Sequence, residues 1–428
     1  MKPRILSAVL CSAYFGSALA AQALSDTVPA LTAEAIKAYR AKDYARFLEY
    51  EQRALRLDPS SPRLQYNVAC GQALQGNAPE AVRLLDQLVS RKLDLGAETD
   101  EDFSNIRAAQ EWKEFEARLA ELRKPMVHSQ VAFQLDDPTL MSTGIAVDAA
   151  TGDIYIASVR RRKIIRRTST EQVSDFIKEA QDGFLAGASL AIDSRRRVLY
   201  ASTAAAPFMV GYQREDAGKS GIFAFALKSG RLVRKALLPV DGKQHFLNAL
   251  ALDRSGNVYV SDSGTSGIYR LRPGSRELEA LTTPGMFQST QGLAFSDDQK
   301  TLFVADYSNG LWALDMASKT TRRVETPIDS WLAGLDGLTR TRDGFIAVQI
   351  GVKPERVIRL RFDQKWERVA SVEVLEMNHP DYNGPVQGVV SDGAFLYVAN
   401  SQLALGNGET GAFAAERAKP TVVLRLPL

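Results

Sequence analysis

The chain has 428 residues, enough for two domains with cores of their own, and its composition is that of an ordinary globular protein. Its 53 basic and 50 acidic side chains nearly balance. This balance argues against a dedicated nucleic-acid-binding protein, because such proteins need a net basic surface to displace counterions. We therefore expect no nucleic-acid partner.

Residues 1–20 are typical of a secretory signal peptide. Lys2 and Arg4 precede a mostly apolar run, and Ala18 and Ala20 supply the small side chains of a cleavage site. The apolar run is shorter than the roughly 20 residues of a membrane span, so we expect no stable span. Cleavage would leave Cys70 as the only cysteine, which rules out an intramolecular disulfide. Such a chain is expected to be exported and to be periplasmic or secreted.

Residues 31–123 are predicted to form a helical domain. Ala, Leu, Glu and Arg are frequent there, and apolar residues recur with the period of a helix. Similar phrases begin at Asp43 and Asn77, and this interval of 34 residues is the period of tetratricopeptide repeats. Two repeats and a closing helix around Trp112 could form a groove for a protein partner, or could simply pack as a helical block. The sequence leaves both alternatives open.

A phrase of two short apolar strands around a polar turn recurs six times in the remainder of the chain. The clearest copy spans residues 245–262, with its turn at residues 253–257. The six copies begin at positions 143, 188, 248, 291, 336 and 387. Repeats of about 40 to 50 residues with four strands each are β-propeller blades. We therefore predict an α + β multidomain chain, in which a short all-α, tetratricopeptide-like domain is followed by an all-β six-bladed propeller over residues 131–428.

The remaining strands of the blades can also be located. A third strand is expected in each blade, at residues 163–167, 221–227, 267–271, 310–314, 356–362 and 422–426. The last blade runs out of chain after its third strand. Residues 131–135 precede the first blade and can supply the missing outer strand. This pairing would close the ring and leave no open sheet edge.

Six side chains should surround the mouth of the central channel. Counting back five positions from the turn in each copy gives Thr143, Ala188, Asn248, Gln291, Asp336 and Gln387. Four of them carry amide or carboxylate oxygens, which could coordinate a hard cation such as calcium, an ion that takes about six to eight oxygen ligands. The alternative is a polar lining around a water-filled channel.

The phrases Leu-Asn-Ala-Leu-Ala-Leu-Asp around Asn248 and Leu-Asp-Gly-Leu around Asp336 resemble the regucalcin/gluconolactonase family of six-bladed propellers. That resemblance implies a divalent metal, calcium above all, held at the channel mouth by Asn248 and Asp336. It also implies hydrolysis of sugar lactones or related esters, with Asp336 as a candidate base. The family's metal-binding glutamate falls on Thr143 here, and a substrate-contacting asparagine falls on Ala188.

The repeats are equally similar to NHL-repeat propellers, many of which bind a ligand or a partner without catalysing a reaction. This second resemblance implies a non-catalytic, exported binding or scaffold protein. Its helical repeats would recruit a protein, and its propeller would hold a ligand or a partner.

Loops are expected to complete the mouth. Residues 203–220 and 401–420 form two long loops that should fold over it and cover a small-molecule ligand. His245 and His379 lie in loops that lead to the same mouth, and His379 is close to Asp381. A histidine beside a carboxylate can act as a general base, whereas most loop histidines are simply exposed.

Overall fold

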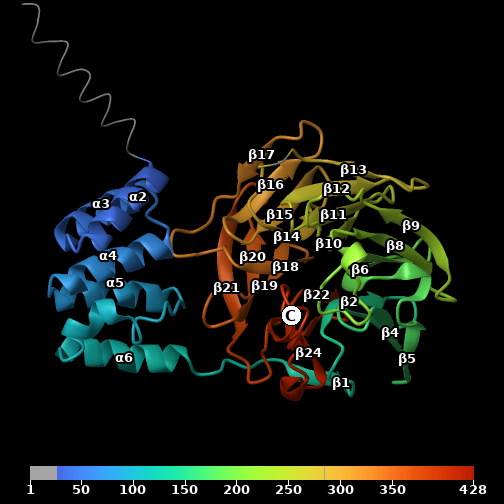
Figure 1. Cartoon of the computed structure of the whole chain (residues 1–428), viewed down its shortest axis with the longest axis horizontal. Helices are drawn as coiled ribbons and strands as arrows, with labels where there is room; N and C mark the ends of the chain where they lie inside the picture. Colours follow the sequence, from blue (N-terminus) through green and yellow to red (C-terminus); the bar gives the residue numbers. More distant parts are fainter. Residues whose placement is uncertain (1–26, 284) are drawn as a thin grey trace, which may run out of the picture. The chain divides into compact units, whose positions relative to one another are not determined.

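The computed structural model describes residues 27–283 and 285–428, so the signal peptide predicted at residues 1–20 lies outside the described residues. The chain divides into two compact units (Figure 1). The first unit ends at Arg123 and includes Ile328–Trp331, and the second comprises Lys124–Pro327 and Leu332–Leu428. Among the helices in the described ranges, none is long and apolar enough to cross a membrane.

The first unit is helical, as predicted. Two helix pairs, in which α2 packs on α3 and α4 packs on α5, are followed by a 3-10 helix and a closing helix. The elements are α2 (Val28–Arg40), α3 (Tyr44–Leu57), α4 (Pro62–Leu74), α5 (Ala78–Ser90), η1 (Glu101–Ile106) and α6 (Gln110–Leu122). The apolar face of α6 buries Trp112, Phe115 and Leu119.

Side-chain caps explain where the four paired helices begin. Thr27, Asp43, Ser61 and Asn77 each accept a hydrogen bond from the backbone N–H three residues further on. Thr27 and Ser61 are 34 residues apart, as are Asp43 and Asn77, so both helices of a pair recur with this interval. The interval agrees with a tetratricopeptide-like arrangement, which stays a prediction.

The second unit is a six-bladed β-propeller, which confirms the predicted fold class. Each blade is a four-stranded antiparallel sheet. The first three blades are β2 (Ser142–Asp148), β3 (Asp153–Ser158), β4 (Lys163–Arg167) and β5 (Val173–Ile177); β6 (Ala186–Asp193), β7 (Val198–Ala204), β8 (Ser220–Ala226) and β9 (Leu232–Leu237); and β10 (Leu247–Leu252), β11 (Val258–Asp262), β12 (Gly267–Leu271) and β13 (Leu278–Ala280).

The other three blades follow the same order from the centre outwards. They are β14 (Thr290–Phe295), β15 (Thr301–Asp306), β16 (Gly310–Asp315) and β17 (Thr321–Arg323); β18 (Leu335–Arg340), β19 (Gly344–Gln349), β20 (Arg356–Phe362) and β21 (Val369–Met377); and β22 (Gly388–Ser391), β23 (Ala394–Val398), β24 (Thr421–Pro427) and β1 (Gln130–Leu135). Each innermost strand contacts the innermost strand of the next blade, and β22 contacts β2, so the ring is continuous (Figure 1).

The hydrophobic core of the propeller lies between its blades. Six apolar clusters of buried side chains each join two neighbouring sheets, for example Phe303 of β15 with Phe345 of β19 and Phe362 of β20. Successive side chains along a strand point to opposite faces of its sheet, so each blade presents one set of side chains to each of its two neighbouring blades. For this reason the repeated phrase is apolar on both faces. This arrangement fixes the radial positions of the inner strands.

The predicted closure of the ring is confirmed. The N-terminal strand β1 pairs antiparallel with β24, from Gln130 opposite Arg425 to Leu135 opposite Thr421. The last blade is thus built from both ends of the propeller sequence, and its outer edge is paired.

A buried carboxylate holds the segment that leads into this closing strand. Glu376, fully buried near the end of β21, accepts hydrogen bonds from the backbone N–H groups of His128 and Ser129 at 2.8 and 2.7 Å. It also accepts bonds from the hydroxyl of Ser129 at 2.9 Å and from those of Tyr382 and Tyr397. Five donors therefore fix one carboxylate between two blades.

Candidate functional site

A cavity of about 480 Å³ opens at one end of the propeller axis. All six side chains that the repeat register predicts for the channel mouth line it: Thr143, Ala188, Asn248, Gln291, Asp336 and Gln387. The structure therefore brings together residues that are up to 244 positions apart in the sequence (Thr143 and Gln387). Of the described residues that line it, Asp336 is the only charged one.

Irregular strand pairing directs these side chains into the channel. In five of the six inner strands the pairing register shifts at the ring position, for example between Leu247 and Leu250 around Asn248, and between Leu335 and Gly337 around Asp336. A β-bulge bends its strand and re-aims the side chain at that point.

The residue after Asp336 allows the neighbouring blade to come close. A Cβ at Gly337 would lie 2.5 Å from the Cα of Gln387, so this position accepts only glycine without a shift of the next inner strand. The close approach places the backbone N–H of Gln387 where it donates to Asp336.

A second group of lining residues was not predicted from the sequence. Val159, Ser263, Tyr307 and Ile350 each come directly after the second strand of a blade, and Phe246, Ser289 and Val386 come one or two positions before a ring residue. A signal for the first four was present, because they occupy the same place in four copies of the repeat. Their varied side chains conceal this shared position.

The two long loops meet near the cavity. Leu403, in the loop that follows β23, is one of the lining residues. In the same region Phe208 and Met209 of the loop after β7 join Phe413 in an apolar cluster. The Arg160 guanidinium lies 4.2 Å from the centre of the Phe413 ring, a cation–π distance. Both loops therefore contribute to one apolar structure beside the cavity mouth.

The environment of Asp336 sets its acidity. Desolvation by burial raises its pKa from 3.8 to about 6, and the hydrogen bond from the Gln387 backbone opposes the rise only in part. Among the described residues no basic side chain forms an ion pair with Asp336. Its charge in turn raises the pKa of Tyr307, after the larger effect of that ring's own burial. A carboxyl group with this pKa is present in both protonation states near neutral pH.

Asn248 and Gln291 form a pair on the cavity wall. The Asn248 Nδ2 donates to Gln291 Oε1 at 2.5 Å. This bond uses an amide hydrogen of Asn248 and leaves its Oδ1 as an acceptor, and it leaves the Gln291 Nε2 as a donor. The ring therefore offers both hydrogen-bond donors and oxygen ligands.

The hydroxyl of Thr143 is bonded to the neighbouring inner strand. It donates to the carbonyl oxygens of Gly187 and Ala188, at 3.0 and 2.9 Å, and the residue is only 7% exposed. The position at which the resembling family has a glutamate thus supplies a structural hydrogen bond between two inner strands.

The donor set fits a hard divalent cation held weakly. The carboxylate of Asp336 has no basic partner in the described part of the chain, and the amide oxygen of Asn248 is the same kind of ligand that calcium takes. With a single negative charge, and with the Thr143 hydroxyl already bonded to the backbone, we expect low affinity. The metal remains a prediction.

Neither predicted loop histidine is among the residues that line the cavity. Nδ1 of His245 lies 2.5 Å from Asp262, the last residue of β11, and Nε2 lies 3.1 Å from Asp241 in the preceding loop, so both ring nitrogens face carboxylates. The Nδ1 of His379 accepts from the Asp381 backbone at 3.1 Å. Both histidines are buried and fix local loop structure.

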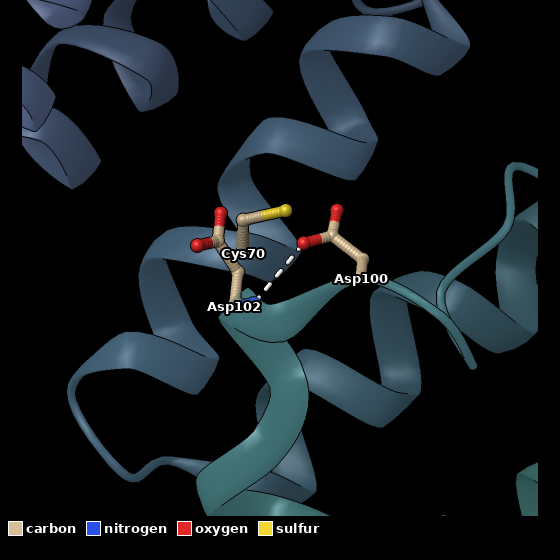
Figure 2. Close-up of side chains that lie close together, drawn as sticks. All are labelled: Cys70, Asp100 and Asp102. Atoms are coloured by element: carbon tan, nitrogen blue, oxygen red, sulfur yellow. Dashed lines mark hydrogen bonds between the residues drawn. The ribbon is translucent and has the colours of Figure 1, made fainter.

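The helical unit contains one other group of side chains with metal-ligand character in the described part of the chain: Cys70, Asp100 and Asp102 (Figure 2). The carboxylates already accept hydrogen bonds, Asp100 from Tyr66 at 2.8 Å and Asp102 from Tyr39 at 2.6 Å. Burial raises the pKa of the Cys70 thiol far above its ordinary value, and the two carboxylates add to the effect. The thiol is therefore protonated, and these groups act as a partly buried polar contact between α4 and η1.

No protein-family model matches the chain, and no curated protein matches it. Solved structures are similar in fold. A luciferin-regenerating enzyme is 13% identical, with 71% of this chain and 96% of that chain covered and a TM-score of 0.50.

Two further structures have slightly lower scores. A gluconolactonase from Xanthomonas campestris is 15% identical over 71% of this chain and 95% of its own, with a TM-score of 0.46. A PQQ-bound aldose sugar dehydrogenase from Streptomyces coelicolor is 15% identical over 71% and 98%, with a TM-score of 0.47. At 13% identity, the luciferin-regenerating enzyme shows a likeness in fold alone.

Proposed function

We propose that this chain hydrolyses a lactone or a related ester in the cavity at the channel mouth. The observation that carries the proposal is Asp336. It is the single charged group among the described residues that line the cavity, and burial raises its pKa to about 6. Enzymes use a carboxyl group with such a raised pKa as a general acid or base, because it can accept and return a proton near neutral pH.

In the proposed reaction Asp336 acts first as a general base and then as a general acid. Its carboxylate takes a proton from a water molecule while the water oxygen forms a bond to the carbonyl carbon of the substrate. The ring C–O bond then breaks, and the departing oxygen takes the proton back from Asp336. The products are a hydroxy acid and the free carboxylate of the enzyme, so protons and atoms balance.

Amide groups of the ring would stabilise the charge that develops on the carbonyl oxygen. The Nε2 atoms of Gln291 and Gln387 are donors within the cavity lining, and a fixed donor in a site of low polarity stabilises an oxyanion strongly. A divalent cation, calcium above all, would be held by Asp336 and by Oδ1 of Asn248. When bound, such an ion would polarise the carbonyl group.

Hydrolysis of a lactone panel by wild-type protein and by the Asp336→Asn variant tests the proposal. We expect turnover by wild type and a loss of about 10²–10⁴-fold in the variant, the usual contribution of a general base. Asp297→Asn is the matched control, because Asp297 lies in a turn outside this cavity with its side chain 78% exposed. Wild-type protein without turnover, or an Asp336→Asn variant with full activity, would reject the assignment.

The residue type at position 143 favours a second candidate, a non-catalytic binding protein. Threonine stands where the resembling lactonases have a glutamate, so among the described lining residues Asp336 is the only carboxylate, where those lactonases have two. In this case the propeller holds a ligand and the helical unit recruits a protein partner. Ligand binding without turnover would support this alternative.

The predicted signal peptide supports export of the protein to the periplasm or the medium. Determination of the N-terminal residue of the protein recovered from its native cell tests this part. Cleavage after Ala20 is the expected result, and an intact Met1 contradicts it.

A further inference from the structure

The lining of the cavity has two tiers at different depths. On four inner strands the last residue of the second strand pairs with the residue just before the ring position, as Ser158 pairs with Ser142 before Thr143. Because the strands are antiparallel, the residue after the second strand lies about two positions closer to the mouth than the ring residue. At about 3.3 Å per residue this is roughly 7 Å.

The two tiers differ in chemistry. The inner tier consists of the ring residues and contains the carboxylate of Asp336 and the amides of Asn248, Gln291 and Gln387. The outer tier is mostly apolar or aromatic: Val159, Phe246, Tyr307, Ile350 and Val386, with Leu403 from the long loop. Within residues 27–283 and 285–428 no lysine or arginine lines the cavity, so this part of the chain offers no basic partner for an anionic ligand.

The apolar outer tier continues into the loops. Val159 belongs to the cluster that also contains Met209 and has Phe208 and Phe413 packed against it. A ligand that extends from the inner tier towards the mouth therefore passes a mainly apolar wall, interrupted by the hydroxyl groups of Ser263 and Ser289. Phe246, Tyr307 and Ile350 are each partly exposed, which leaves part of their surface for such a ligand to cover.

We propose that the substrate is an uncharged lactone or ester with an alkyl chain, not a polyhydroxylated sugar lactone. The carbonyl group lies against the inner tier, within reach of Asp336, and the alkyl chain lies against the outer tier and Leu403. This assignment rests on the proposed hydrolase function and specifies its substrate class.

Burial energetics separate the two kinds of substrate. Each methylene group that leaves water for the outer tier should raise kcat/KM about fourfold, which corresponds to about 0.8 kcal/mol. Each sugar hydroxyl placed against Val159, Ile350 or Val386 loses its water without gaining a partner. A single unpaired hydroxyl should lower kcat/KM by about tenfold or more.

A series of lactones that share one ring size tests the proposal. The substrates are δ-valerolactone, δ-hexalactone, δ-octalactone and δ-decalactone, with D-glucono-δ-lactone as the polyhydroxylated member. We expect kcat/KM to rise about fourfold per methylene until the cavity is filled, and D-glucono-δ-lactone to be at least 100-fold poorer than δ-decalactone. A flat series, or a preference for the gluconolactone, would overturn the proposal.

A variant of the outer tier adds a second test. Ile350→Asn should reduce the ratio of kcat/KM for δ-decalactone to that for δ-valerolactone by about tenfold, because the alkyl chain loses an apolar partner. Ile328→Asn makes the same change at a side chain that is 71% exposed and is not among the cavity-lining residues, so it should leave this ratio unchanged. An unchanged ratio in Ile350→Asn would overturn the assignment of the outer tier.

Calorimetric binding of alkyl δ-lactams, which resist hydrolysis, distinguishes failure of the substrate class from failure of the function. Wild-type protein that binds δ-decanolactam more tightly than δ-valerolactam but hydrolyses none of the lactones supports the alkyl-binding cavity and rejects the hydrolase. Protein that hydrolyses D-glucono-δ-lactone as well as δ-decalactone supports the hydrolase and rejects the alkyl preference.

Discussion

Asp336 and Glu376 are two carboxyl groups in the same blade with opposite environments. Burial raises the pKa of Asp336 to about 6, and one backbone N–H opposes it. Burial also acts to raise the pKa of Glu376, but hydrogen bonds from Tyr397, His128 and Ser129 outweigh it, and its pKa lies below the ordinary value. The comparison teaches that the number of donors, and not burial alone, decides whether a carboxylate is a structural anchor or a group available for proton transfer.

The largest expected effect separates activity from stability at Asp336. Asp336→Asn should lower the hydrolysis rate by about 10²–10⁴-fold, while the protein becomes more stable at pH 8 because a desolvated charge is removed. Lactone hydrolysis and urea unfolding of the same preparation measure both quantities. A loss of activity that merely parallels a loss of stability would make Asp336 a structural residue like Glu376.

The opposite result is expected at the anchor. Glu376→Ala should lower the free energy of unfolding by about 3–5 kcal/mol, because several buried donors lose their acceptor. Urea denaturation measures the change. Glu373→Ala, on the same strand but with its side chain 47% exposed and paired with Arg361, is the control and should cost less than about 1 kcal/mol. Equal losses in the two variants would contradict the anchoring role.

The pH dependence of stability should differ in sign at the two sites. The folded state raises the pKa of Asp336 from 3.8 to about 6, so its ionised form destabilises the fold above pH 6 by about 3 kcal/mol. This penalty decreases as the pH falls through that range and vanishes below about pH 4. Glu376 behaves oppositely: its contribution is present above the unfolded pKa of about 4.3 and is lost on further acidification.

Unfolding free energies of wild type and Asp336→Asn across pH 4–8 check this dependence. The difference between the two proteins should be largest at pH 8 and close to zero at pH 4. The hydrolysis rate should rise with pH through about 6 as the base ionises. A stability difference that does not change with pH would mean that Asp336 keeps an ordinary pKa in the folded protein.

The smallest expected effect concerns the number of carboxylates in the cavity. Thr143→Glu would introduce the carboxylate that the resembling family has at this position, and should raise calcium affinity about tenfold or more. It also removes the bonds of Thr143 to the carbonyl groups of Gly187 and Ala188, at a cost of about 1 kcal/mol in stability. Calorimetric titration with calcium measures the affinity.

Thr143→Gln serves as the control for this change, since it has a side chain of the same length without the charge. Equal calcium affinity in the Glu and Gln variants would show that position 143 does not reach the ion, and Asp336 would then lack a second carboxylate whatever residue stands there.

Much of the propeller could be predicted because its signal is local and repeated. The alternation around residues 245–262 and its five other copies identify the blades, and the tight turns fix the register that brings Asn248 and Asp336 to one cavity. The shortage of chain after the third strand of the last blade predicts the pairing of β1 with β24.

The features that were missed depend on contacts between distant segments or on bends in the strands. Glu376 is 247 positions from Ser129, and no periodicity links the two. Tyr307 and Ile350 lie just beyond strand ends, where side chains vary from blade to blade. The tight bonding of His245 to Asp262 and Asp241 likewise follows from the loop conformation, which the alternating pattern does not encode.

The pairing of β1 with β24 also has a consequence for biosynthesis. The strand that completes the last blade, β1, is the first strand of the propeller to leave the ribosome, and its partner β24 is the last. The nascent propeller must therefore leave β1 without its partner until β24 has been synthesised. Closure then pairs strands that are about 290 residues apart in the sequence, and contacts between such distant segments form slowly. Until then the unpaired edge of β1 is open to non-native pairing.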